Sequence, residues 1–275
     1  MMQLNWSKVI HSADPWEPYY NGFFHKSKNC VLFFYEDNNA LCALQQKEES
    51  ADAIYTTGSG SILPLPAKWT VVNDGDDSFL FLDKDNVIHL SSLETVNDLP
   101  ATLLAAYQKV RKSGAYYEEA PFVLNEYCIS HKGNSSYKCT KNEQLIWEFR
   151  GQAYLYTDIR RWNNRVYFGT AGNGGYLYVL DIDTGEALTK IKTGGTSAIV
   201  QNDRFCYFLG NEKTAKLFCV DLSDGKVVQE ISLPGKALSE SVVQQIDNQI
   251  HAITFVYKGD YLKHAVWSCI SLEHN

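Results

Sequence analysis

The residues of this chain whose types and spacing could do chemistry are aromatic and charged side chains that suit contact with a partner. One group lies on or just after a predicted inner strand and contains Tyr154, Tyr156, Asp158, Arg160, Arg161 and Trp162. Asp158 and Arg160 could form an ion pair in a central channel, or part of an anion or acid–base site there. Arg and Trp are also the residue types that dominate protein interfaces. Structural pairing, partner contact and catalysis therefore stay open for this group.

Two further groups place aromatic rings beside carboxylates in predicted connections between repeating units. They contain Trp16, Glu17, Tyr19 and Tyr20 in one connection, and Tyr116, Tyr117 and Glu118 in another. Because the two connections are equivalent, we expect both on one face of the molecule. Such a surface suits a basic protein partner, and packing of the rings on the fold is the alternative.

The sequence contains no motif for catalysis or for a bound cofactor. The run Asn73–Asp77 holds three carboxylates but lacks the spacing and terminal Glu of a calcium loop, so we interpret it as a solvated hairpin. The seven His form neither HxH nor HExxH, and no CxxC, GxSxG, Walker or dinucleotide motif occurs. We therefore predict no catalytic residue, no metal and no cofactor, while a metal site assembled from several repeats stays open.

Composition limits the class of partner. The 275 residues carry 25 Lys and Arg against 32 Asp and Glu, a net charge of −7. An acidic surface disfavours nucleic acid and attracts a basic protein. The chain shows neither a leader pattern nor the roughly 18 apolar residues of a membrane span. The seven Cys lie mostly in strand patterns, as reduced thiols do, so we expect a cytoplasmic protein without a membrane or nucleic-acid partner.

Two stretches of the chain align on each other without a gap. Asn163–Ile191 matches Asp203–Ile231 at an offset of 40 residues, with Asp181 on Asp221 and Gly185 on Gly225. A repeat of about 40 residues built from strand patterns is typical of a β-propeller blade. Each Asp should accept hydrogen bonds from turn amides, and each Gly can supply a positive φ.

Weaker copies of this repeat extend the pattern over the whole chain. The predicted blades span 20–57, 61–97, 115–151, 153–195, 196–236 and 240–272. The last lacks an outer strand, which Leu4–His11 should supply by crossing over, since closure removes an exposed edge. We predict one all-β domain over 1–275, a single propeller of six four-stranded blades, with seven as the alternative.

The blade around the first repeat can be divided into strands, and one segment elsewhere departs from the strand pattern. The four strands are predicted over 154–159, 165–170, 176–182 and 187–192. A helix is predicted near 99–113, with Asp98 as its N-cap and Pro100 in its first turn. Its apolar residues are Leu103, Leu104, Tyr107 and Val110. This helix is either a lid on the flank of the fold or a partner-binding element.

The string GGYLYVLDIDTGEAL, residues 174–188, resembles the repeat of quinoprotein-type (PQQ-like) propellers. Trp147 stands where that repeat often holds Trp in its outer strand, and the resemblance covers about a third of the chain. The family includes quinone-dependent dehydrogenases, which are longer, eight-bladed and usually exported, and non-catalytic scaffolds. This chain also lacks the vicinal Cys pair of several of those enzymes, so the resemblance implies the fold and argues against the cofactor.

These observations favour a non-catalytic propeller scaffold that binds a protein partner through one face. One version is an immunity-type protein that inhibits a bacterial toxin, because small acidic proteins without catalytic motifs fit that role. Two alternatives stay open. The first is an enzyme with its site in the central channel, such as a lactone or glycan hydrolase, with or without a metal. The second is a sensor that binds a small molecule through channel aromatics.

Overall fold

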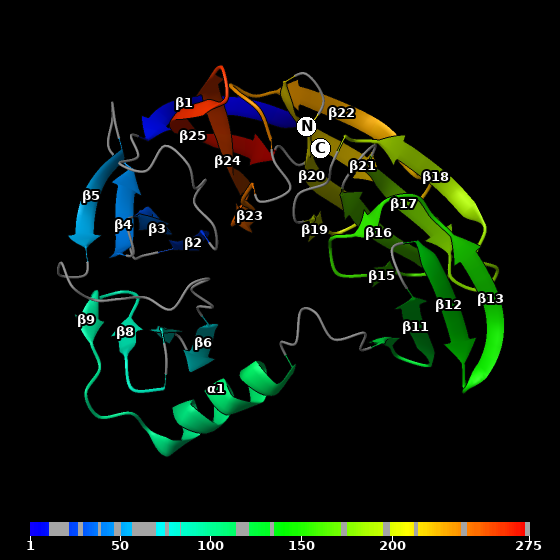
Figure 1. The fold of residues 1–275 in the computed structure, drawn as a ribbon, viewed down its shortest axis with the longest axis horizontal. Coiled ribbons are helices and arrows are strands. Elements are labelled where there is room, and N and C mark those ends of the chain that lie inside the picture. The colour runs from blue at the N-terminus through cyan, green and yellow to red at the C-terminus, as the bar shows by residue number, and fades with distance from the viewer. Residues whose placement is uncertain are drawn as a thin grey trace. The chain divides into compact units, whose positions relative to one another are not determined.

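The computed structural model describes residues 1–10, 22–26, 30–37, 40–46, 51–56, 70–74, 77–82, 84–113, 121–132, 135–171, 175–194, 199–211, 214–237 and 241–272. These residues form six antiparallel sheets and one helix (Figure 1). The chain divides into two compact units. Unit 1 comprises Met1–His11 and Glu119–Asn275, and unit 2 comprises Ser12–Glu118.

Unit 2 contains two four-stranded sheets whose strands follow one another in chain order, as in propeller blades. Blade 1 consists of β2 (Phe23–Lys26), β3 (Val31–Asp37), β4 (Ala40–Gln46) and β5 (Ala51–Thr56). Blade 2 consists of β6 (Thr70–Asp74), β7 (Asp77–Phe81), β8 (Val87–His89) and β9 (Glu94–Thr95). Asp74 pairs with Asp77 across the β6–β7 turn, so the acidic run forms the predicted hairpin.

The helix α1 (Ala101–Ser113) covers blade 2 within unit 2 (Figure 1). Leu103 and Tyr107 are buried against Phe81, and the rings of Tyr107 and Phe81 stack with centroids 4.3 Å apart. The apolar face predicted for this helix therefore packs on a sheet, as expected if the helix is a lid on the flank of the fold.

The start of α1 differs from the prediction. The amides of Leu103 and Leu104 donate to the carbonyl of Pro100, and the helix begins at Ala101. Pro100, not Asp98, therefore occupies the capping position. Proline is tolerated at the start of a helix because the first amides have no partner within the helix, so its missing N–H leaves no hydrogen bond unmade.

Unit 1 contains the other four sheets. Blade 3 consists of β10 (Phe122–Leu124), β11 (Tyr127–Lys132), β12 (Ser136–Lys141) and β13 (Gln144–Arg150). Blade 4 consists of β14 (Tyr154–Leu155), β15 (Arg160–Trp162), β16 (Arg165–Ala171), β17 (Tyr176–Asp181) and β18 (Ala187–Lys192). Blade 5 consists of β19 (Val200–Asn202), β20 (Phe205–Asn211), β21 (Ala215–Asp221) and β22 (Lys226–Ser232).

Blade 6 joins the two ends of the chain. Its order is β1-β25-β24-β23, with β1 (Met2–Ile10), β23 (Val243–Ile246), β24 (Gln249–Lys258) and β25 (Tyr261–Leu272). The N-terminal strand pairs antiparallel with β25, from Met2 opposite Leu272 to Ile10 opposite Ala265. The predicted closure of the last blade by the N-terminal segment is confirmed.

The core of unit 1 lies between successive blades. β17 and β21 are buried on both faces, which is why their sequences are almost continuously apolar. Their alternate residues enter different clusters: Tyr178 packs toward blade 3, and Leu177 and Val179 pack toward blade 5. The outer strands β18 and β22, at the edges of their sheets, contain only exposed and half-buried residues.

A β-bulge recurs at the same place in the outer strands. The register shifts opposite the third strand leave one extra residue in each of β5, β13, β18, β22 and β1. In blades 3, 4 and 5 these extra residues are Ile146, Leu188 and Val228. A bulge increases twist and disrupts an edge, so it protects outer strands against pairing with another chain.

In blades 3, 4 and 5, the residue after the bulge contacts the next blade. Trp147 donates its indole N–H to the carbonyl of Ile182, at 2.7 Å, and its ring lies against Gly185. At the equivalent position of blade 4, Thr189 lies against Gly225. At that of blade 5, Gln229 exchanges two hydrogen bonds with the backbone of Met2, at 2.6 and 2.8 Å.

The tight turns of the repeat have the predicted geometry. The Oδ1 of Asp181 accepts the amides of Asp183 and Thr184, both at 3.0 Å, and that of Asp221 accepts the amide of Ser223 at 2.9 Å. Gly185 and Gly225 have φ values of 71° and 70°. The Asp and Gly of the repeat therefore build the turns.

The predicted fold class is confirmed: the described residues are all-β with one helix, and their six sheets have the strand order of β-propeller blades. The prediction of one continuous inner strand over 154–159 is wrong. The strand is split into β14 and β15, because the amides of Tyr156 and Thr157 both donate to the Gly169 carbonyl and interrupt the ladder. That all 275 residues form one domain stays a prediction.

Candidate functional site

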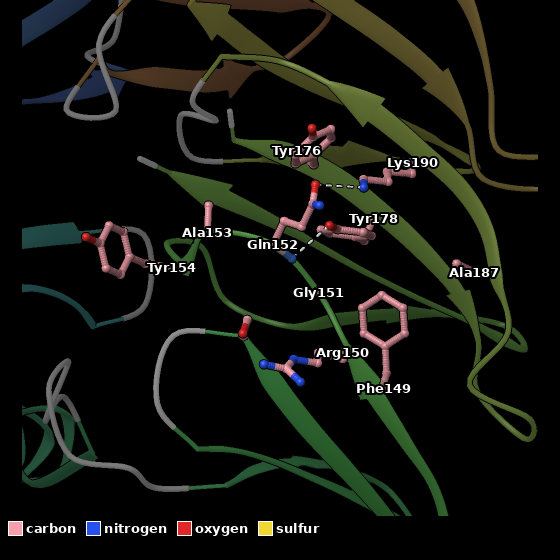
Figure 2. Close-up of a pocket in the computed structure, with 11 residues that line it drawn as sticks. Phe149, Arg150, Gly151, Gln152, Ala153, Tyr154, Tyr176, Tyr178, Ala187 and Lys190 are labelled. Carbon is pink, nitrogen blue, oxygen red and sulfur yellow. Dashed lines mark hydrogen bonds between the residues drawn. The ribbon is translucent and has the colours of Figure 1, made fainter. Parts of the chain in front are cut away.

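An open groove lies between blades 3 and 4, within unit 1. Its volume is about 1180 Å³, and it is lined by the end of β13, the connection Gly151–Ala153, the start of β14, and residues of β17 and β18 (Figure 2). Its side chains come from both walls: Ser135, Phe149, Arg150, Gln152, Tyr154, Tyr176, Tyr178, Ala187 and Lys190.

The floor of the groove is aromatic. Phe149 meets Tyr178 edge to face with ring centroids 5.3 Å apart. The Phe149 ring also contacts the buried rings of Tyr137 and Phe168, and the Tyr178 ring contacts that of Phe168. The chain crosses these rings at Gly151, where an added Cβ would lie 3.2 Å from Tyr137. The glycine therefore lets the backbone lie directly on the ring cluster.

A polar network spans the groove above these rings. The amide of Gln152 donates to the Tyr178 hydroxyl at 3.0 Å, and Lys190 Nζ donates to Gln152 Oε1 at 2.8 Å (Figure 2). The same ammonium lies over the Tyr176 ring, 4.2 Å from its centroid. Burial raises the pKa of Tyr178, so this hydroxyl stays protonated at neutral pH.

Beneath the floor lies a buried hydroxyl. Tyr137 is 1% exposed, and its hydroxyl has no hydrogen-bond partner among the residues that the structure describes. Burial and the neighbouring Tyr178 raise its pKa. A buried hydroxyl without a partner costs free energy, so the ring cluster is maintained by its packing rather than by this group.

The charge of the groove is positive. Arg150 and Lys190 line it, and no carboxylate does in the described part of the chain. Arg150 is exposed at the end of β13 and has no described ion pair or hydrogen bond through its side chain. Lys190 is held by an amide oxygen and two rings, all of them neutral.

The predicted residues of β15 lie away from the groove. Tyr154 pairs with Ala171 at one end of β16, and Trp162 pairs with Arg165 at the other end. The groove is lined by Tyr154, at the first of these two ends. The structure therefore does not bring Arg161 and Trp162 together with the groove.

Those residues are engaged between blades. Arg161 lies 3.6 Å from Glu126, and its guanidinium lies 4.8 Å from the centroid of the Tyr127 ring. Trp162 is half-buried against the cluster between blades 4 and 5. No ion pair within 4.0 Å joins the described Asp158, which is exposed, to the described Arg160, so of the roles left open for this group the structure does not show this pairing.

Arg160 interacts with a neighbour on the next strand instead. Burial raises the pKa of the Tyr167 hydroxyl, and the Arg160 guanidinium offsets part of this rise. Tyr167 also donates to Gln201 of blade 5. Arg160 therefore belongs to a polar contact that joins blades 4 and 5.

The two predicted face groups lie outside the described residues. They are Trp16, Glu17, Tyr19 and Tyr20, and Tyr116, Tyr117 and Glu118. Their assignment to a partner-binding face stays a prediction.

A hydrogen-bonded Asp–His–Ser chain occurs in blade 2. His89 Nε2 lies 3.2 Å from Asp77 Oδ1, and His89 Nδ1 lies 2.9 Å from Ser92 Oγ. The amide of Glu94 also donates to Ser92 Oγ, at 3.3 Å. All three side chains lie at the surface, around the turn that follows β8.

Metal ligands, reactive thiols and membrane spans are further kinds of functional feature. Among the described residues, no group of three or more His, Cys, Asp or Glu could hold a metal ion. The described cysteines are free thiols, and four of the six are buried. No helix in the described ranges has the length and apolar character to cross a bilayer.

Sequence reasoning named Tyr154 but missed the other residues of the groove, although a signal for them was present. The gapless repeat alignment places Lys190 on Glu230 and Tyr176 on Lys216. A charge reversed between two copies of one repeat marks a position where the copies serve different purposes.

No protein-family model and no curated protein matches the sequence. Among solved structures, the chain is similar to BamB from Moraxella catarrhalis, with 11% identity, a TM-score of 0.45, and coverage of 100% of this chain and 99% of that chain. The computationally designed Ika4 protein is 18% identical, with a TM-score of 0.38 and coverage of 49% of this chain and 82% of that chain. The computationally designed Ika8 protein is 10% identical, with a TM-score of 0.36 and coverage of 92% of this chain and 99% of that chain. With these TM-scores, the likenesses carry no argument about what the chain binds.

Proposed function

We propose that the chain is a non-catalytic β-propeller scaffold that binds a protein partner through one face, and that the groove between blades 3 and 4 is part of that face. The groove carries the proposal. It combines an open concave shape with tyrosine, phenylalanine and arginine side chains, which are enriched at protein interfaces.

The predicted aromatic–acidic groups stay part of the proposal. In the sequence they precede the first strands of blades 1 and 3, as Gly151–Ala153 precedes the first strand of blade 4. We propose that they contact the same protein partner through their aromatic and acidic side chains.

The finer version of the proposal is an immunity-type inhibitor of a bacterial toxin, in the non-catalytic branch of the PQQ-like propellers. The acidic net charge of −7 favours a partner that is basic overall. The cysteines within strand patterns favour a cytoplasmic location. The toxin version would be supported by rescue of growth when the chain and its captured partner are expressed together.

The test is capture of a partner from the native host, followed by calorimetry with the purified partner. Tyr154 is 54% exposed and lines the groove, so Tyr154→Ala should weaken binding at least about tenfold, roughly 1.4 kcal/mol. Tyr261→Ala is the matched control, since Tyr261 is 58% exposed at the β24–β25 turn. Trp162→Ala tests the second predicted patch.

Two results would contradict the proposal. One is the absence of any stoichiometric protein in the captured material. The other is a captured partner whose affinity is the same for Tyr154→Ala, Trp162→Ala and the wild type.

Hydrolysis is the second candidate function, and the Asp77–His89–Ser92 chain is the observation in its favour. The ordinary role of this arrangement is a capped turn, because Ser92 also accepts an amide and the group is exposed. Labelling by a fluorophosphonate probe that is lost in Ser92→Ala would favour the enzyme. If the probe labels the wild type and Ser92→Ala equally, Ser92 is not its target, and these residues serve to hold the turn.

A further inference from the structure

We propose that the groove between blades 3 and 4 binds an acidic peptide segment, with Lys190 and Arg150 holding carboxylates and the aromatic floor holding an adjacent apolar side chain. This inference rests on the proposed function and names the chemistry of the partner at this site. It starts from a position where one copy of the repeat differs from the other two.

The position of Lys190 is acidic in the neighbouring blades. The residue that follows the blade-linking position is Glu148 in blade 3, Lys190 in blade 4 and Glu230 in blade 5. Glu148 pairs with Lys138 at 2.6 Å, and Glu230 pairs with Lys216 at 2.9 Å. Blades 3 and 5 therefore neutralise this position internally.

Blade 4 replaces both partners of that ion pair. Tyr176 stands at the position of Lys216, Tyr178 stands at that of Lys138, and the outer strand carries the lysine. The ammonium then rests on neutral groups, the two rings and the Gln152 oxygen. A cation held by rings and an amide keeps its charge available for an anion from outside.

The opposite wall supplies a second cation. Arg150 ends β13 beside Gly151, on the other side of Gln152 and Tyr178 from Lys190 (Figure 2). A guanidinium presents a planar set of donors that matches a carboxylate. Two cations facing one groove on a protein of net charge −7 select acidic groups by local charge complementarity.

The aromatic floor favours a peptide over a small anion. Phe149 and Tyr176, both half-buried, line the groove together with the two cations. Ring surface is suited to burying an apolar side chain, which an inorganic anion lacks. A segment with carboxylates on both sides of an aromatic residue would meet all three features, and a partner that is basic overall can carry such a segment.

The experiment measures fluorescence anisotropy with three labelled pentapeptides. They are Glu-Glu-Phe-Glu-Glu, its Gln-Gln-Phe-Gln-Gln analogue and its Lys-Lys-Phe-Lys-Lys analogue. We expect the acidic peptide to bind the wild-type protein at least about tenfold more tightly than either analogue. Its affinity should fall as salt rises, since exposed charges are screened.

The variants test the two cations. Lys190→Glu, which introduces the residue of the neighbouring blades, and Arg150→Gln should each weaken the acidic peptide at least about tenfold. Lys263→Glu is the matched control, because Lys263 is exposed on β25 of the same unit and makes the same charge change outside the groove. This control should stay within about twofold of the wild type. Circular dichroism shows that each variant is folded.

The outcomes separate this inference from the proposed function. Equal binding of acidic and basic peptides, or unchanged binding by folded Lys190→Glu and Arg150→Gln, overturns the inference. A captured partner that loses affinity for Tyr154→Ala but not for Lys190→Glu keeps the proposed function and overturns the inference. Selective acidic binding without a captured protein supports the inference and contradicts the proposed function.

Discussion

His251 is a titratable side chain that folding buries completely, near the start of β24. Its Nδ1 accepts the indole N–H of Trp267 at 3.1 Å, so the neutral tautomer protonated at Nε2 fits this contact. Burial lowers the pKa of His251 to about 4. The side chain must therefore stay neutral in the folded protein at pH values where it is charged in the unfolded chain.

This shift predicts a loss of stability in weak acid. Between the unfolded pKa of 6.5 and the folded value of about 4, the unfolded state binds more protons, so stability falls as pH falls. The full effect is about 3 kcal/mol, present above pH 6.5 and lost by about pH 4. His251→Gln keeps an acceptor for Trp267 without titrating.

Urea unfolding at pH 7.5 and pH 5.0 measures this effect. We expect the wild type to lose more of its unfolding free energy between the two pH values than His251→Gln does. The same loss in both proteins would mean that other groups carry the acid sensitivity.

At the scale of elements, the contact between outer strands and turns joins blade to blade. Gly185 has a φ of 71°, and a Cβ there would lie 2.6 Å from the Trp147 ring. The ring also bonds to the Ile182 carbonyl, so displacing it leaves a buried carbonyl unpaired. This junction has little room to adjust, because interiors are close-packed.

Gly185→Ala should therefore destabilise the protein by about 2–4 kcal/mol, from backbone strain and loss of the Trp147 contact together. Gly259→Ala is the control. Its φ is 65° and no atom lies within 4 Å of the position that the added methyl group would take, so strain alone should cost about 1 kcal/mol. Chemical unfolding measures both variants, and equal losses would show that Trp147 does not oppose the methyl group.

At the scale of the whole molecule, the N-terminal strand closes blade 6. β1 supplies the outer edge of that sheet, Met2 joins its core cluster, and Gln229 of blade 5 holds the backbone of Met2. A chain without residues 1–10 would expose the edge of β25, and an exposed edge invites pairing with another chain.

Deletion of residues 1–10 should therefore abolish the cooperative thermal transition or cause aggregation. A peptide of residues 1–10 added in trans should restore the soluble folded state, and a scrambled peptide of the same composition should not. Light scattering and circular dichroism measure the outcome. A truncated chain with an unchanged melting temperature would contradict the structural role of β1.

The sequence alone determined the repeat, the turns of its blades and the closure of the last blade. The offset of 40 residues, with Asp181 on Asp221 and Gly185 on Gly225, predicted the blades and their turns, because turn chemistry and strand periodicity are local. The missing outer strand of the last blade likewise pointed to the N-terminal segment, since an incomplete sheet needs a partner strand. The apolar face of α1 was also predictable, because helical spacing places Leu103 and Tyr107 together.

Only the tertiary structure decided which side chains meet. The ion pair that the sequence allowed between Asp158 and Arg160 is not formed between these described residues; Arg160 interacts with Tyr167, and Arg161 lies beside Glu126. The groove combines Arg150 of one blade with Lys190 of the next, 40 residues apart in the chain. Local patterns cannot specify such contacts, because they depend on how two separately folded sheets pack face to face.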